Sequence, residues 1–213
     1  MYLLNNVKYK GILRIAKLEI KSGKVTCIVG ESGSGKSTLL KLLNKMISND
    51  EGNIMFEGIP LDKLNSITLR RNVAMLPQSP AIFPGSIREN LLIGLKFSEK
   101  PIVDDNTLNE TLEFVSLTKA LDEDAEVLSG GEKQRLALGR ILLLDPPVFL
   151  LDEPSSALDE NTEHIIIEKL VEHVKSRNKT MIMVTHSIKI AQKFSDEIIE
   201  IRNGEVVSYR EVL

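Results

Sequence analysis

The sequence predicts an α/β fold in which a mostly parallel sheet packs against helices, with an antiparallel β subdomain at the N-terminus and an inserted helical subdomain. Apolar runs at 148–151 and 181–184 alternate with segments of helical periodicity, which is typical of a parallel sheet. Short β-type runs precede them, and helix-capping signatures gather in the middle third. At about 100–200 residues per domain, we expect a single domain over residues 1–213.

The N-terminal region contains short β-type runs separated by turn residues. The turns are at Gly11, Ser22-Gly23 and 50–52, and this pattern predicts a small antiparallel sheet. The four runs are Leu3-Leu4, 15–20, 25–29 and 53–56. From Lys36 onward the apolar spacing changes to that of a helix, with Leu39, Leu40, Leu43, Met46 and Ile47 on one face.

The middle third is predicted to be helical. Ser and Thr residues followed three positions later by Glu match a capping box, which marks a helix start. The three pairs are Ser86 with Glu89, Thr107 with Glu110, and Ser129 with Glu132. Because strand-like runs at 73–76 and 148–151 flank this region, we expect a helical subdomain at about 78–140, inserted into the α/β core.

The C-terminal third predicts a helix that starts after Asp159, the strand 181–184, and a helix through Ile190 and Ala191. The runs 198–201 and 206–209 predict a hairpin that turns at Asn203-Gly204, a dipeptide that readily adopts a type I′ turn. His164 and His173 are predicted to be ordinary surface residues of the first helix.

Composition excludes several classes of function. The 27 Lys and Arg against 30 Asp and Glu give a net charge of -3, which disfavours nucleic acid as a partner. No apolar run is long enough to cross a bilayer and no signal peptide is visible, so the chain is predicted to be cytoplasmic. The single cysteine, Cys27, lies in an apolar run and is predicted to be buried rather than reactive.

The segment from Gly30 to Ser37 has the spacing G-x-x-x-x-G-K-[ST] between a strand-like run and a helix. In such a loop, backbone N–H groups surround a phosphate, the lysine reaches the terminal phosphates and the serine hydroxyl binds Mg²⁺. The expected ligand is therefore a nucleoside triphosphate. The residues of this phosphate-binding loop (P-loop) are Gly30, Glu31, Ser32, Gly33, Ser34, Gly35, Lys36, Ser37 and Thr38.

Two further motifs carry candidate site residues. The apolar run 148–151 ends in Asp152 and Glu153, where an α/β sheet places ligand-facing residues. Asp152 is expected to hold Mg²⁺ through water, and Glu153 to deprotonate the water that attacks the γ-phosphate. Leu-Ser-Gly-Gly-Glu at 128–132 opens a helix with accessible N–H groups, and beside a P-loop it predicts a second anion site.

These motifs, in this order, resemble the nucleotide-binding subunit of ABC transporters, and the resemblance covers essentially the whole chain. It implies a P-loop NTPase core, ATP and Mg²⁺ as cofactors, and ATP hydrolysis. By resemblance, Gln78 meets Mg²⁺, the attacking water and the membrane partner, and His186 contacts the γ-phosphate. Tyr9 is the best match for the aromatic residue stacked on adenine, with Tyr2 as the alternative.

The resemblance also implies an assembly. ATP would close a head-to-tail dimer of two copies, with Lys36 and Ser37 on one side of each γ-phosphate and Ser129, Gly130 and Gly131 of the other copy opposite. The segment Ser156-Ala157-Leu158-Asp159 resembles the loop that crosses between protomers. A separate transmembrane permease subunit would hold the chain at the cytoplasmic face of the membrane.

The cargo is less closely specified. The layout is most similar to small stand-alone bacterial subunits proposed to drive export of iron or other metals. The run 78–90 resembles both exporter-type subunits and phosphate importers. An importer ATPase of the phosphate type and a soluble ABC ATPase without a transporter stay open as alternatives. The chain has no coiled-coil heptads and only one cassette, unlike the DNA-repair and ribosomal classes.

Overall fold

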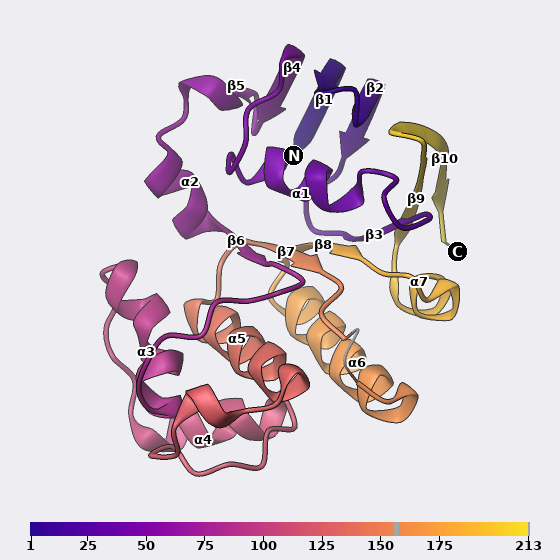
Figure 1. Cartoon of the computed structure of the whole chain (residues 1–213). Coiled ribbons are helices and arrows are strands. Elements are labelled where there is room, and N and C mark those ends of the chain that lie inside the picture. Colours follow the sequence, from indigo (N-terminus) through magenta and orange to yellow (C-terminus); the bar gives the residue numbers. More distant parts are fainter. Residues whose placement is uncertain (156–157, 213) are drawn as a thin grey trace.

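A six-stranded, mostly parallel sheet forms the centre of the computed structural model, which describes residues 1–155 and 158–212 (Figure 1). The strand order is β10-β9-β3-β8-β7-β6, and all neighbours run parallel except β10 and β9. The strands are β3 (Val25–Val29), β6 (Val73–Leu76), β7 (Val148–Asp152), β8 (Thr180–Val184), β9 (Glu197–Arg202) and β10 (Glu205–Glu211).

A four-stranded antiparallel sheet, of order β2-β1-β4-β5, lies on one side of the central sheet (Figure 1). Its strands are β1 (Tyr2–Tyr9), β2 (Leu13–Ile20), β4 (Glu51–Phe56) and β5 (Ile59–Pro60). The assignment of the run 25–29 to this sheet was wrong. All five of its residues are buried, and the strand pairs in parallel with β8 and β9, because a continuous apolar run suits a strand that is covered on both faces.

Alternate residues of the parallel strands face two separate cores. Phe149 and Leu151 of β7 pack among the helices on one face, whereas Val148 and Leu150 pack against α1 (Lys36–Leu43) and the antiparallel sheet. Cys27 is fully buried as predicted, and burial raises the pKa of its thiol to about 12, which keeps it protonated.

Helix α1 is shorter than the apolar spacing predicts. It ends at Leu43, where Asn44 caps it, and Lys45 then adopts a left-handed φ of 55°. Met46 and Ile47 therefore lie outside the helix, and Met46 is 54% exposed. The turn is held by the Asn44 side chain, whose Nδ2 donates to the carbonyl of Val73 at 2.8 Å.

Helices fill the segment between β6 and β7, as predicted. They are α3 (Ile87–Phe97), α4 (Asp105–Phe114) and α5 (Gly130–Leu144), while α2 (Ser66–Asn72) precedes β6. Ser86 and Ser129 cap α3 and α5 with complete capping boxes. The start predicted at Thr107 was wrong, because the Asp104 carboxylate accepts from the Thr107 N–H at 2.9 Å and starts α4 earlier.

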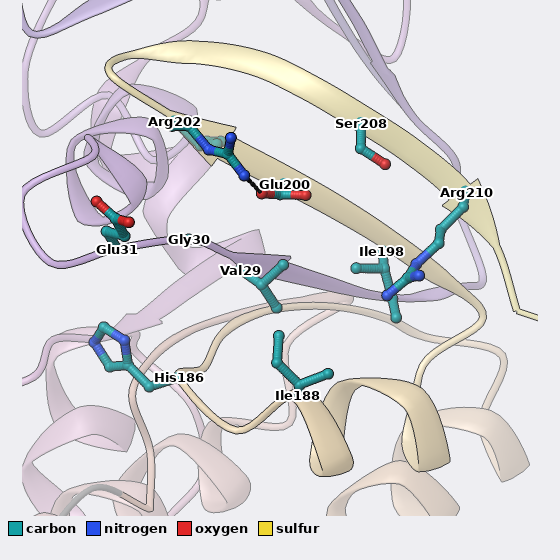
Figure 2. A pocket seen from close by; sticks show the side chains of 11 residues that line it. Val29, Gly30, Glu31, His186, Ile188, Ile198, Glu200, Arg202, Ser208 and Arg210 are labelled. Carbon is teal, nitrogen blue, oxygen red and sulfur yellow. Dashed lines mark hydrogen bonds and ion pairs between the residues drawn. The ribbon is translucent and has the colours of Figure 1, made fainter.

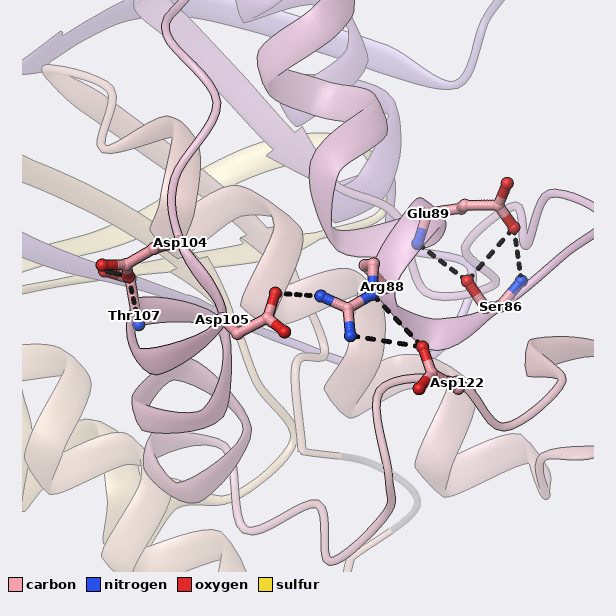
Figure 3. A network of polar contacts seen from close by, with 7 residues as sticks. All are labelled: Ser86, Arg88, Glu89, Asp104, Asp105, Thr107 and Asp122. Atoms are coloured by element: carbon pink, nitrogen blue, oxygen red, sulfur yellow. Dashed lines mark hydrogen bonds and ion pairs between the residues drawn. The ribbon is translucent and has the colours of Figure 1, made fainter.

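A polar network ties α3 to α4 and to the segment that leads to Ser129 (Figure 3). The Arg88 guanidinium contacts Asp105 on one side and Asp122 on the other, at 3.2 Å. Backbone bonds from Ile87 N to Glu123 O and from Arg88 N to Leu121 O lie alongside it. The loop before Ser129 is therefore anchored to the start of α3.

The remaining helices, α6 (Glu160–Ser176) and α7 (Ile188–Phe194), pack on the face opposite the antiparallel sheet (Figure 1). The hairpin turns at Asn203-Gly204, both with positive φ, as predicted. His173 is not an ordinary surface residue: its ring lies edge-on to Phe114 and Phe149, and Nε2 is 3.0 Å from Asp145 Oδ1. Within the described ranges, none of the helices combines the length and apolar character that a bilayer crossing requires.

Candidate functional site

The P-loop connects β3 to α1 and turns sharply at its glycines. Gly30, Gly33 and Gly35 all have positive φ, at 145°, 78° and 104°. A Cβ on Gly30 would lie 2.1 Å from the carbonyl oxygen of Ile201, so this glycine also permits close packing against β9. Helix α1 starts at this loop with no side chain capping it, which leaves backbone N–H groups to bind an anion.

Gly30→Ala is expected to destabilise the fold by about 3 kcal/mol or more, because the new methyl group would collide with a main-chain oxygen that cannot move alone. Thermal or urea unfolding without nucleotide measures the effect. Gly33→Ala is the matched control: nothing lies within 4 Å of its Cβ, so only the left-handed backbone cost of about 1–2 kcal/mol applies. Equal losses from the two variants would contradict the packing argument.

The predicted phosphate and metal ligands are adjacent. Lys36 Nζ donates to the carbonyls of Gly30 at 2.9 Å and Glu31 at 2.8 Å, and burial lowers the pKa of its ammonium. Ser37 Oγ donates to Asp152 Oδ1 at 2.9 Å. Burial, followed by the nearby Glu153 charge, raises the pKa of Asp152. The buried carboxylate beside the P-loop therefore favours a cationic partner.

Glu153 is held at four points. Its carboxylate accepts from Gln78 Nε2 at 2.8 Å, and its other oxygen lies 2.7 Å from His186 Nε2. Its N–H donates to Val184 O at 3.1 Å, and its carbonyl accepts from Gln134 Nε2 at 2.5 Å. The backbone has a left-handed φ of 52°, a conformation that costs an ordinary residue about 1–2 kcal/mol. The structure thus brings Gln78, Glu153 and His186 together.

His186 is half exposed and borders a cavity of about 330 Å³ between the start of the P-loop and the C-terminal hairpin (Figure 2). Glu31 lies on the same side as His186, and Arg202, paired with Glu200, lies on β9 across the cavity. While the Glu153 carboxylate is ionised, the contact requires a proton on His186 Nε2. The imidazole is therefore oriented as a donor at the edge of the site.

The Ser129 motif lies apart from this cluster. Ser129 and Gly130 are exposed at the start of α5, and Ser129 Oγ donates to Glu132 Oε2 at 2.7 Å. The Ser129 hydrogen bonds lower the pKa of the Glu132 carboxyl. Across residues 1–155 and 158–212, no hydrogen bond joins this motif to the P-loop of the same chain.

Asp159 caps α6 and accepts from the backbone N–H groups of Asn161 and Thr162. Hydrogen bonds from Thr162 lower the pKa of its carboxyl. Ser156 and Ala157, the first half of the predicted crossing loop, lie outside the described residues.

Tyr9 ends β1 and is half buried, with Lys10 Nζ 5.4 Å from its ring centroid. The turn that follows and the start of β2 pack on the P-loop, because a Cβ on Gly35 would lie 3.3 Å from Ile12 O and 2.6 Å from Leu13 Cδ2. The alternative, Tyr2, is fully buried and donates to Leu43 O at 3.0 Å, so its ring is not available to a ligand. Burial also raises the pKa of Tyr2 above its usual range.

Gln134, on the helix α5 that Ser129 caps, is a site residue that the sequence did not reveal, because its contact is with Glu153. Gln134 is 3% exposed, and a buried glutamine in an apolar helix needs a hydrogen-bond partner. Its position on the apolar side of the helix was the available signal, but only the packed structure identifies the partner.

Comparison with known proteins establishes the family. The sequence profile described as "ABC transporter" matches residues 13–156. The chain belongs to the ABC transporter family. This ABC ATPase is 40% identical over 197 residues to Protein STAR1 of Oryza sativa, covering 92% of the chain and 57% of that protein. It is 39% identical to the phosphate import ATP-binding protein PstB 1 of Lactobacillus acidophilus, covering 91% of the chain and 77% of the relative.

Solved structures share the fold of this ABC ATPase. One is the dimeric ATP-binding cassette MJ0796 bound to ADP and phosphate, with a TM-score of 0.89 and 30% identity. The match covers 100% of the present chain and 99% of the MJ0796 chain. Another is a bacterial Atm1-family ABC exporter with ATP bound, with a TM-score of 0.89 and 26% identity. That match covers 99% of the present chain and 38% of the exporter chain. The predicted P-loop NTPase fold, with its antiparallel β subdomain, is confirmed.

The relatives differ in what surrounds the cassette. The chain spans 34% of the glutathione/L-cysteine transport system ATP-binding/permease protein CydC of Escherichia coli, at 37% identity, and a little over half of the rice protein. The relatives of this ABC ATPase have names with different transport roles.

Proposed function

We propose that this ABC ATPase supplies the energy for a membrane transporter, closing as a head-to-tail dimer when ATP binds and reopening after hydrolysis. The observation that carries the proposal is the position of the Glu153 carboxylate between Gln78 and His186. The neighbouring residue, Asp152, contacts Ser37 of the P-loop. A carboxylate that is oriented by two neighbours and mostly shielded from water is suited to accept a proton from an attacking water.

The donor set at the P-loop fits magnesium. Mg²⁺ prefers oxygen ligands, and Ser37 Oγ and Asp152 Oδ1 lie 2.9 Å apart with the carboxylate buried. Ser37, Asp152 and Gln78 are the residues that would hold the ion that accompanies ATP. When bound, it supplies charge neutralisation on the phosphates.

The chain's own residues perform the remaining steps. Lys36 exchanges its contacts with the Gly30 and Glu31 carbonyls for the terminal phosphates, and the uncapped N–H groups of α1 surround them. Glu153 takes the proton of the attacking water, and His186 contacts the γ-phosphate. Tyr9 stacks on the adenine beside the turn that packs on the P-loop.

The dimer supplies the second half of each site. Because Ser129, Gly130 and Gly131 are at an exposed helix start and Lys36 is in a separate loop, we assign the Ser129 motif to the nucleotide of the second copy. Asp159 belongs to the loop that crosses to that copy. The dimeric structure of the MJ0796 cassette supports this arrangement.

A groove next to Gln78 suits a helix of the membrane subunit. It measures about 550 Å³ and lies between the α/β core and the proposed helical subdomain at about 78–140. Arg70 and Arg140 line it, and none of the described lining residues is acidic. Burial lowers the pKa of Arg140 to about 10. Its guanidinium donates to Ala81 O and to Asn90 O and Oδ1, and it lies over the Phe83 ring.

The groove therefore favours an apolar helix that carries a carboxylate. Since Pro77 lines the groove and precedes Gln78, movement of that helix would reach the Gln78 contact with Glu153. This partner would keep the ATPase at the cytoplasmic face of the membrane. The membrane partner would determine the cargo. The relatives named as phosphate import and glutathione/L-cysteine transport proteins give no support to metal or iron export, which stays a prediction.

Affinity capture tests the transporter function. Tagged Glu153→Gln protein, incubated with ATP and Mg²⁺ in detergent-solubilised native membranes, is expected to retain a multi-span membrane protein in near-stoichiometric amount. Met46→Glu should abolish that capture, because Met46 lines the groove and is 54% exposed. The added carboxylate would occupy the groove arginines and repel an acidic partner.

Ile67→Glu is the matched control, since Ile67 is 63% exposed on α2 and does not line the groove. Capture that survives Ile67→Glu and fails with Met46→Glu supports the docking assignment. Capture of soluble proteins alone, with wild type and Glu153→Gln alike, would overturn the transport role and favour a soluble ABC ATPase.

A further inference from the structure

Gln134 makes a contact that the proposed function leaves unexplained. It lies within α5, the helix whose N-terminus presents the Ser129 motif, and is 3% exposed. Its side-chain amide donates to the carbonyl oxygen of Glu153 at 2.5 Å. The hydrogen bond therefore joins the helix that carries the Ser129 motif to the backbone of the proposed catalytic residue.

The backbone of Glu153 needs such support. Its φ of 52° is left-handed, and the next residue is Pro154, which favours extended conformations in the residue before it. The Glu153 N–H is paired with Val184 O, so the Gln134 amide fixes the other end of the same residue. Rotation of this backbone would carry the carboxylate away from Gln78 and His186.

We propose that Gln134 is a positioning residue that holds Glu153 in its catalytic orientation and makes that orientation depend on the placement of α5. This inference rests on the proposed head-to-tail dimer. In that dimer the Ser129 end of α5 binds the nucleotide of the opposite site, while Glu153 serves the nucleotide of its own P-loop. Gln134 thus couples ATP binding at one site to the orientation of the catalytic carboxylate at the other.

Gln134→Leu tests the inference through steady-state ATP hydrolysis. The expected result is a 10- to 100-fold fall in kcat with the KM for ATP changed less than about twofold, because the P-loop is untouched while the carboxylate is misplaced. Gln134→Met, unbranched and closer in shape to glutamine, guards against a folding defect. Leu138→Met, a buried volume-conserving change on the same helix, is the control and should keep kcat within about twofold.

A double-mutant cycle separates positioning from structural damage. In a Glu153→Gln background, adding Gln134→Met is expected to change the residual rate less than about twofold and to leave the ATP-dependent dimer intact, since no catalytic carboxylate remains to be positioned. Equal losses in both backgrounds, or wild-type kcat in a folded Gln134→Met, would overturn the role of Gln134 alone. Normal turnover by Glu153→Gln itself would instead overturn the proposed mechanism.

Discussion

Glu153→Gln is expected to lower kcat about 10²- to 10⁴-fold while the affinity for ATP stays within a few fold of wild type. The amide has nearly the shape of the carboxylate but cannot accept the proton of the attacking water, and general-base catalysis contributes rate factors of that size. The variant can keep one of the two contacts through its amide oxygen, and its NH2 group can donate to the other partner if the Gln78 amide turns over or the His186 imidazole changes tautomer, so the site should keep its architecture.

Phosphate release and equilibrium nucleotide binding measure the two quantities separately. Because ATP is bound but not cleaved, Glu153→Gln should also accumulate as a dimer when ATP and Mg²⁺ are present, which light scattering detects. Glu160→Gln is the control, since Glu160 is an exposed glutamate on α6 that forms an ion pair with Lys189. Near-normal turnover by Glu153→Gln would remove Glu153 as the base.

Lys36→Ala is expected to weaken ATP binding about 100-fold or more. Lys36 is 5% exposed, and its ammonium sits inside the P-loop on the carbonyls of Gly30 and Glu31, where the terminal phosphates would replace those oxygens. A charge-assisted contact to a phosphate contributes about 1.5–3 kcal/mol, and each 1.4 kcal/mol is a factor of ten in affinity. The loss of two such contacts accounts for the expected change.

Titration with a fluorescent ATP analogue, together with thermal unfolding to check the fold, measures this effect. Lys41→Ala is the matched control, because Lys41 lies on the same helix and near the Asp152 charge but outside the loop. If Lys41→Ala weakens binding as much as Lys36→Ala, the effect is general charge loss. Unchanged affinity in Lys36→Ala would exclude its phosphate role.

Features that depend on neighbouring residues were predictable. The P-loop spacing, the Ser86 and Ser129 capping boxes and the Asn203-Gly204 turn each arise from a few consecutive residues, so their local chemistry is complete in the sequence. The one capping error, at Thr107, has the same origin: two acceptors lie within one turn, and the earlier one, Asp104, starts the helix.

Features that depend on what covers a segment were not predictable. The run 25–29 reads as a strand in either sheet, and only its neighbours β8 and β9 place it in the parallel one. Tyr2 and His173 are polar enough for the surface, yet both are packed inward, with hydrogen bonds to Leu43 and Asp145. Burial of such residues depends on partners far away in the chain.

The sequence by itself determined the residue types of the site: a lysine and serine in a glycine loop, two acids after an apolar strand, and the Leu-Ser-Gly-Gly-Glu helix start. Only the tertiary structure decided how they meet. It brings together Glu153 and Gln78, which are 75 residues apart in the sequence, and Glu153 and His186, which are 33 residues apart. It also places the Gln134 amide within hydrogen-bond distance of the Glu153 carbonyl. These contacts follow from the order of the parallel strands and the packing of α5, which are set by the whole core rather than by any local spacing.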